Sequence, residues 1–238
     1  MEEAKAAGVD VVVDIGMGTV ESAATVARVL ELEGVYGAVG VHPNDLAEFE
    51  ADADATMSTI ASLASNDRIV GVGETGLDFY REHSSPQLQV EAFRAHIALA
   101  RELDRALVVH CRDAQQRVLE VLDEAATPGR VIMHCFSGDE AYARECARRG
   151  FFCSFAGNVS FKNAAQLRAA AAAVAEDLLL IETDAPFLAP EPFRGKPNAP
   201  KLLPLTLGAL AAAVGMAPES LGIVLRRNSA RAFALDLS

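Results

Sequence analysis

Hydrophobic positions along the 238 residues gather in short runs separated by longer amphipathic stretches. The runs are apolar almost throughout rather than alternating, as expected for strands buried on both faces. The stretches between them, such as 19–32 and 86–103, have the periodicity of amphipathic helices. The runs predict seven strands, at about 10–16, 35–42, 68–74, 106–111, 130–135, 151–156 and 177–183.

Strands and helices alternate along the whole chain, which predicts a mainly parallel sheet and the α/β class. A closed (β/α) barrel needs eight strands, and the runs supply seven. The first run is preceded only by Glu-Glu-Ala-Lys-Ala-Ala and Gly8, which is typical of the end of a helix with a glycine cap. We therefore expect a barrel that lacks its first strand, with that strand and most of a helix upstream of this sequence.

Composition narrows the class of protein. Because such barrels commonly run to ~250 residues as one domain, residues 1–238 are expected to form a single, N-terminally incomplete domain. A net charge of -12 disfavours nonspecific coating of duplex DNA. The four cysteines show no Cys-x-x-Cys spacing, which favours reduced, buried thiols. No apolar stretch approaches the ~20 residues of a membrane span, and no signal peptide is recognisable. A cytoplasmic protein without membrane contact is expected, and the oligomeric state stays open.

Four metal-capable side chains stand at the ends of four apolar runs. They are Glu74, His110, His134 and Asp184, and in a parallel barrel the C-terminal strand ends carry the chemistry. Two imidazoles and two carboxylates suit a divalent cation such as zinc, manganese or magnesium. Glu74 is the candidate bridge between two ions, and Asp184 is both a ligand and a proton acceptor for attacking water. This pattern indicates a metal-dependent hydrolase with Glu74 and Asp184 as catalytic residues.

Three other polar residues lie near the ends of the predicted strands, and the sequence leaves two roles open for His42 and for Arg112. His42 ends the second run and is either a fifth site residue that contacts substrate or part of a turn anchored by Pro43. Arg112 follows His110 closely, and it either orients a substrate phosphate or makes a structural ion pair. Asp78 is expected to hold an arginine or a loop rather than substrate.

Local cations are available between Arg194 and Lys201. Arg194 and Lys196 are the candidates for contacts to a phosphate backbone. His83 and His96 fall in a loop and a helix, and both are expected at the surface.

Six motifs in sequence order resemble those of the TatD family of metal-dependent deoxyribonucleases, and the resemblance runs from about residue 8 to the C-terminus. The motifs are Gly-Val-His-Pro (40–43), Gly-Glu-Thr-Gly-Leu-Asp-Phe-Tyr (73–80), Val-His-Cys-Arg-Asp-Ala (109–114), His-Cys-Phe-Ser-Gly (134–138), Phe-Lys-Asn-Ala (161–164), and Glu-Thr-Asp-Ala-Pro-Phe-Leu-Ala-Pro (182–190) with Arg-Gly-Lys-Pro-Asn (194–198). The resemblance implies a TIM-type barrel of the amidohydrolase superfamily, two divalent metal ions, and hydrolysis of phosphodiester bonds in DNA, often from a 3′ end.

The resemblance also assigns roles. The bridging glutamate falls on Glu74, the two histidines of the second metal site fall on His110 and His134, and the aspartate of the first site falls on Asp184. Members of the family normally open with a strand ending in His-x-His, and this motif does not occur among the 238 residues. We therefore expect the site built from Glu74, His110 and His134 to be the better occupied, and activity to be impaired.

Two classes of function fit these residues. The first is a deoxyribonuclease that binds DNA weakly and works from an end. The second is a catalytically impaired relative that keeps the pocket to bind phosphate or a partner. Within the enzyme class, hydrolysis of another ester or an amide bond on the same barrel is the alternative, because function resides in the site rather than in the fold.

Overall fold

The computed structural model describes residues 1–81 and 83–237. Its described residues contain seven strands, the number expected from the apolar runs, and each strand falls within or next to one run. The pairs β1–β2, β2–β3, β3–β4 and β6–β7 are all parallel, which confirms the α/β class. The chain divides into two compact units. We call Val11–Ile132 the N-terminal unit, and Met1–Asp10 with Met133–Ser238 the C-terminal unit.

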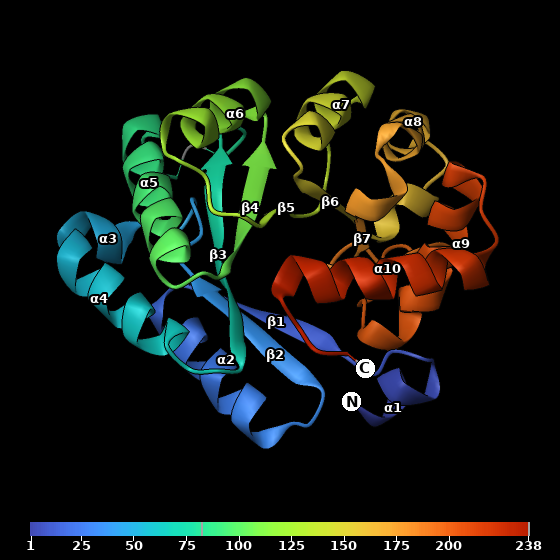
Figure 1. The fold of residues 1–238 in the computed structure, drawn as a ribbon, viewed down its shortest axis with the longest axis horizontal. Coiled ribbons are helices and arrows are strands. Elements are labelled where there is room, and N and C mark those ends of the chain that lie inside the picture. Colours follow the sequence, from blue (N-terminus) through green and yellow to red (C-terminus); the bar gives the residue numbers. More distant parts are fainter. Residues whose placement is uncertain (82, 238) are drawn as a thin grey trace. The chain divides into compact units, whose positions relative to one another are not determined.

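The N-terminal unit contains four strands in chain order, with helices between them (Figure 1). Its strands are β1 (Val12–Met17), β2 (Val35–Gly40), β3 (Ile69–Asp78) and β4 (Ala106–Arg112). Its helices are α2 (Thr19–Glu31), α3 (Ala47–Ala51), α4 (Ala53–Ala64), α5 (Pro86–Glu102) and α6 (Gln115–Glu124). Strand β5 (Val131–Met133) lies at the division between the units.

Local sequence signals set the helix bounds in this unit. Helix α5 begins at Pro86, a residue suited to the first helical position, and the Ser85 hydroxyl accepts the Leu88 N–H at 3.2 Å. Its apolar face buries Phe93 and Ile97 completely. Helix α4 is capped in the same way by Asp52. The two predicted amphipathic stretches, 19–32 and 86–103, are both helices, α2 and α5.

Strand β3 is buried along all ten of its residues, as a strand covered on both faces should be. Two glycines let it approach β4 closely: a Cβ on Gly73 would lie 2.4 Å from the Val108 carbonyl oxygen, and one on Gly76 would lie 2.1 Å from that of His110. Both glycines have a φ above +130°, where other residues are strained. Strand β1 departs from the expected burial, because most of its residues are only half-buried.

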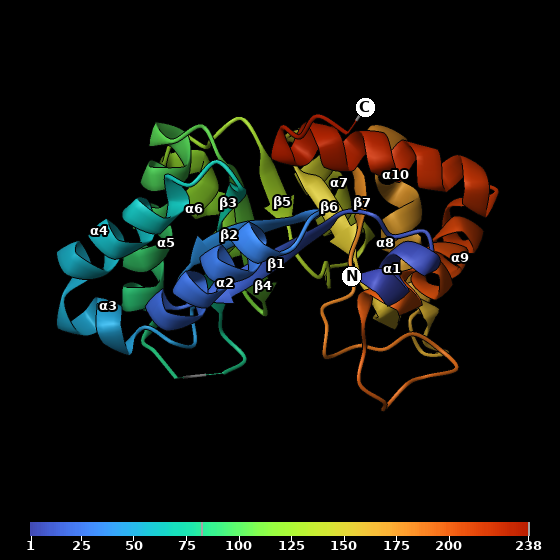
Figure 2. The same ribbon diagram turned by 90° about the horizontal axis from the view of Figure 1, so that it is seen from below.

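The C-terminal unit contains helix α1 (Glu2–Ala6) and the parallel strands β6 (Phe152–Phe155) and β7 (Leu179–Ile181). Its other elements are α7 (Glu140–Arg148), α8 (Ala165–Ala173), α9 (Leu203–Val214), α10 (Pro218–Phe233) and the short 3-10 helices η1 (Gly157–Ser160), η2 (Glu176–Leu178) and η3 (Pro200–Leu202). Figure 2 shows α8, α9 and α10 beside β6 and β7. The buried Asn228 side chain ties α10 to this unit, because its amide donates to the carbonyls of Glu176 and Leu179.

The N-terminal helix ends as its sequence predicts. Gly8 follows α1 with a φ of +84°, and its N–H and that of Val9 return to the carbonyls of Lys5 and Ala4. The four cysteines are thiols, as expected, but only Cys146 and Cys153 are buried, whereas Cys111 and Cys135 are half-buried. Among the described helices none is long and apolar enough alone to cross a membrane; one bent pair, 200–214 with 218–233, reaches that length and composition only when both are counted together.

Candidate metal centre

Parallel pairing places Glu74 and His110 on adjacent strands. Gly76 of β3 stands opposite His110 of β4, and the register shifts between Val72 and Thr75. The expectation that Glu74 ends its strand is wrong by four residues, because β3 continues to Asp78. The irregular pairing brings the Glu74 carboxylate against the imidazole of the next strand.

Three atoms that can bind a metal converge in the N-terminal unit. Glu74 Oε1 lies 2.6 Å from His110 Nδ1 and 3.6 Å from His42 Nε2. The two imidazoles also face each other, with His42 Nε2 at 3.3 Å from His110 Nδ1. The side chains are 8% to 18% exposed, so solvent reaches the group but does not surround it.

Asp78 fixes the protonation of His110. Its Oδ2 lies 3.2 Å from His110 Nε2, and an ionised carboxylate only accepts hydrogen bonds, so Nε2 carries the ring proton. Burial raises the pKa of Asp78, but the Arg81 N–H, the Asn44 amide and His110 outweigh that effect and hold it below its ordinary value. His110 Nδ1 and the Glu74 carboxylate therefore point at the same place, and a divalent cation held there would take the Nδ1 lone pair of the neutral ring together with a carboxylate oxygen.

The expectation that Asp78 holds an arginine or a loop is met only in part. Its Oδ1 does accept the N–H groups of Tyr80 and Arg81 in the following loop. Its other oxygen, however, orients a candidate metal ligand. Spacing from Glu74 gave no signal for this role, which depends on how β3 and β4 pair.

His42 is part of this group rather than only of a turn. Its Nδ1 accepts the Asn44 N–H at 3.1 Å, so a neutral ring carries its proton on Nε2. That N–H points at Glu74 and His110. His42 is therefore better suited to donate a hydrogen bond than to bind a metal ion. Asn44, which sequence reasoning missed, also donates its side-chain amide to Asp78 at 2.8 Å.

A second group lies in the C-terminal unit, after β5 and β7. His134 Nε2 is 3.6 Å from Asp184 Oδ1, and His134 Nδ1 is 2.9 Å from Glu182 Oε1. Glu182 also accepts the Cys135 N–H at 3.1 Å. A carboxylate on one ring nitrogen leaves the other directed at a ligand site, the arrangement typical of metal-bound histidines.

Glu182 was missed from sequence, although it stands two residues before Asp184 in a motif already noted. The geometry thus brings Glu74 together with His110, and His134 together with Asp184, each pair within one unit. That all four share one pocket stays a prediction.

The candidate phosphate-binding cations contact aromatic rings. The Arg112 guanidinium lies 3.8 Å from the Tyr80 ring centroid, and that of Arg194 lies 4.2 Å from Phe161. Lys196 is exposed and lines a pocket with Phe161. Their role toward phosphate stays a prediction.

One histidine is placed wrongly by sequence reasoning. His83 is exposed as expected, but His96 is completely buried. Its Nδ1–H donates to the Ala92 carbonyl at 2.7 Å, and its Nε2 accepts the Val41 N–H at 3.0 Å. Burial lowers the pKa of His96 to about 4 despite the bond to Ala92. His96 thus fixes the backbone directly before His42.

Comparison with known proteins agrees with this geometry. The profile of the family described as "TatD related DNase" matches residues 1–234. The chain is 41% identical to the "Uncharacterized metal-dependent hydrolase TatD" of Mycobacterium tuberculosis, across 99% of this chain and 90% of that protein. It is 37% identical to the "3'-5' ssDNA/RNA exonuclease TatD" of Cronobacter turicensis, with the same coverage.

A solved structure shows the same fold. The crystal structure of YjjV, a TatD homologue from Escherichia coli, superimposes with a TM-score of 0.91 over 99% of this chain and 90% of that chain, at 23% identity. The fold is therefore the TatD-like, TIM-type α/β fold that the motifs implied. Together with the matched profile and relatives, this shows that the chain belongs to the TatD-related DNase family of metal-dependent hydrolases.

Proposed function

We propose that this protein is a divalent-metal-dependent nuclease that removes nucleotides from the ends of single-stranded nucleic acid. The observation that carries the proposal is the convergence of Glu74 Oε1 and His110 Nδ1 at 2.6 Å, with Asp78 behind His110. The relatives named as 3′–5′ ssDNA/RNA exonucleases support the substrate class. Magnesium, manganese and zinc are the candidate ions, and two of them are proposed.

In this proposal Glu74, His110, His134 and Asp184 are the protein ligands, with Glu74 as the bridge. A bound divalent cation supplies Lewis acidity to a phosphate oxygen and lowers the pKa of water. Asp184 accepts a proton from the attacking water through its carboxylate. The water oxygen forms a bond to phosphorus while the bond to the leaving sugar oxygen breaks, and that oxygen takes up a proton.

His42, Arg112, Arg194 and Lys196 are proposed to bind the substrate. The Nε2–H of His42, fixed by the Asn44 N–H, can donate to a phosphate oxygen beside Glu74. Cations in this role offset the repulsion between an acidic protein, with a net charge of -12, and a phosphate backbone. Cysteines in the thiol form support a reducing compartment, and we propose the cytoplasm.

The test uses metal-free protein reloaded separately with Mg²⁺, Mn²⁺ or Zn²⁺. The substrates are a 5′-labelled single-stranded oligonucleotide and its circular form, which has no ends. We expect shortening of the linear strand by successive nucleotides, no cleavage of the circle, and loss of at least a hundredfold in rate for Glu74→Gln. Equal cleavage of the circle would overturn the end-directed mechanism. Hydrolysis of carboxyl esters or lactones in place of both nucleic acids would establish the alternative function.

A further inference from the structure

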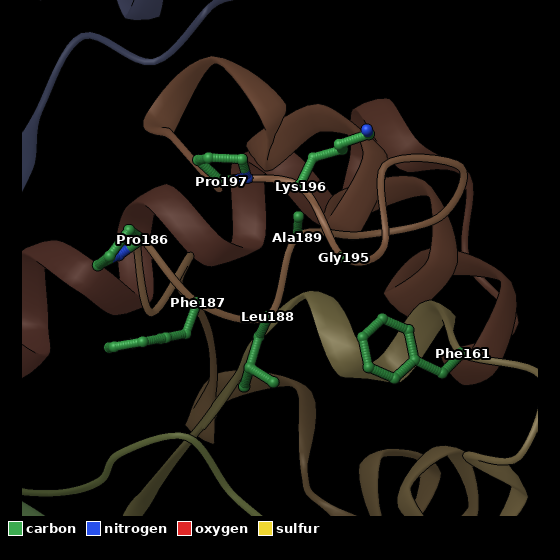
Figure 3. Close-up of a pocket in the computed structure, with 8 residues that line it drawn as sticks. All are labelled: Phe161, Pro186, Phe187, Leu188, Ala189, Gly195, Lys196 and Pro197. Atoms are coloured by element: carbon green, nitrogen blue, oxygen red, sulfur yellow. The ribbon is translucent and has the colours of Figure 1, made fainter.

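A pocket of about 500 Å³ opens in the C-terminal unit beside the segment that carries Asp184 (Figure 3). This volume falls within the ~300–1,000 Å³ that small-molecule sites commonly occupy. Its lining is mostly apolar and comes from the end of η1 and from the loop before η3. The lining residues are Phe161, Pro186, Phe187, Leu188, Ala189, Gly195, Lys196 and Pro197.

The pocket is held in shape by buried polar contacts. Asn198 is 6% exposed, its N–H donates to the Pro186 carbonyl at 2.9 Å, and its side chain donates to the Thr183 carbonyl at 2.7 Å. These bonds close the loop onto the residues that flank Asp184. On the other side, η1 packs tightly against the loop, because a Cβ on Gly157 would lie 2.1 Å from the Leu188 carbonyl oxygen.

Apolar surface and positive charge meet at this loop. Phe187 lines the pocket although 65% of its surface is exposed. Lys196 also lines it, and Arg194 lies against the ring of Phe161. Exposed aromatic rings beside cations are the combination by which proteins bind single-stranded nucleic acid, since every base presents a flat face for stacking and every nucleotide carries a phosphate.

We propose that this pocket holds a nucleobase of one of the two nucleotides that flank the cleaved bond, with Phe187 as the stacking platform and Lys196 near the adjoining phosphate. This inference rests on the proposed function and extends it to the substrate's bases. Stacking on an aromatic ring does not distinguish one base from another. The pocket therefore selects unpaired strands without selecting sequence, because a paired base is not free to enter it.

The first experiment measures binding without cleavage. Protein kept metal-free with a chelator is titrated into oligonucleotides that carry the fluorescent base 2-aminopurine at the terminal or the penultimate position. We expect quenching at one of the two positions, and loss of that quenching in Phe187→Ala. The same substitution at Phe193, a 43% exposed ring on the same loop but outside the described pocket lining, serves as the matched control and should leave quenching unchanged.

The second experiment measures cleavage by the metal-loaded protein. An abasic residue at the position that showed quenching should raise KM by roughly 5- to 150-fold, the range expected from ~1–3 kcal/mol of stacking per base. Phe187→Ala should raise KM for the normal strand and abolish its advantage over the abasic one.

The outcomes separate this inference from the nuclease assignment. If normal and abasic strands are cleaved with equal KM, the pocket does not hold a base while the nuclease function stands. If 2-aminopurine is quenched through Phe187 but no strand is cleaved with any ion, the base site stands and the nuclease function is wrong. Quenching that survives in Phe187→Ala overturns the pocket assignment.

Discussion

At the residue scale, the orientation of the candidate metal ligands depends on side chains outside the predicted ligand set. Asp78 and Glu182 each hold one nitrogen of a histidine whose other nitrogen faces a carboxylate. Such partners set the tautomer and the ring orientation, and their loss typically costs 10- to 100-fold in metal affinity or activity. His96 acts one step further back, through the Val41 N–H.

Replacing Asp78 by asparagine should weaken divalent metal binding by roughly 10- to 100-fold. The substitution keeps the size of the side chain but removes the charge that holds the proton of His110 on Nε2. Titration calorimetry with Mn²⁺ or Zn²⁺ measures the change. Asp54→Asn, at an exposed position in the first turn of α4, is the matched control, and equal affinities in the two variants would contradict the role of Asp78.

The buried His96 should make stability depend on pH. Its pKa is about 4 in the folded protein against 6.5 ordinarily, so the unfolded chain binds more protons between these values. The stabilisation is complete above about pH 6.5 and is lost as the pH falls toward 4, with a total of roughly 3 kcal/mol. Urea unfolding across this range measures it. In His96→Gln, whose amide oxygen can still accept the Val41 N–H, the free energy of unfolding should depend less steeply on pH. The same dependence in both proteins would show that His96 does not titrate as described.

At the element scale, the loop between β7 and α9 carries both the Asp184 segment and the candidate substrate cations. Asn198 pins it to residues 183 and 186, so its exposed side chains start from a fixed backbone. Arg194 and Lys196 are exposed, in contrast to the buried Asn198.

Replacing Arg194 and Lys196 together by glutamine should weaken binding of single-stranded DNA. The dependence of log Kd on log salt should also flatten, because each phosphate contact contributes a slope of ~0.7 for single strands. Fluorescence anisotropy at several salt concentrations measures both effects. Arg144→Gln with Arg148→Gln, on the exposed face of α7, removes the same charge elsewhere. If both double variants show the slope of the unchanged protein, the two cations only support the loop.

At the scale of the whole molecule, the four predicted ligands come in two pairs, one in each compact unit. Glu74 and His110 belong to Val11–Ile132, whereas His134 and Asp184 belong to the C-terminal unit. A shared metal centre would require the two pairs to act as one. The effects of ligand substitutions on the activity of such a centre are strongly non-additive, because the loss of one ligand already disables the centre.

A double-mutant cycle tests this requirement. Glu74→Gln and His134→Ala should each lower kcat/KM by at least a hundredfold on a single-stranded oligonucleotide, and the double variant should be little worse than the poorer single one. Losses that multiply would mean that the two groups work independently. Circular dichroism of each variant provides the control for folding.

Much of the secondary structure of this protein, its candidate ligands and its family can be predicted from its sequence. Continuous apolar runs fix the positions of the strands, amphipathic periodicity fixes α2 and α5, and Gly8 fixes the end of α1, because these signals are local. The candidate ligands Glu74, His110, His134 and Asp184 also stand out locally, as polar residues that interrupt or follow buried runs. Family membership follows from the same motifs.

Other features were decided by tertiary structure alone. Sequence reasoning placed His96 at the surface, yet it lies buried where α5 meets the backbone before His42. The roles of Asp78, Asn44 and Glu182 depend on distances between segments that are 32 to 48 residues apart. No local pattern encodes such distances. They arise when the strands pair in one register and close contacts, such as those at Gly73 and Gly76, bring neighbouring backbones together.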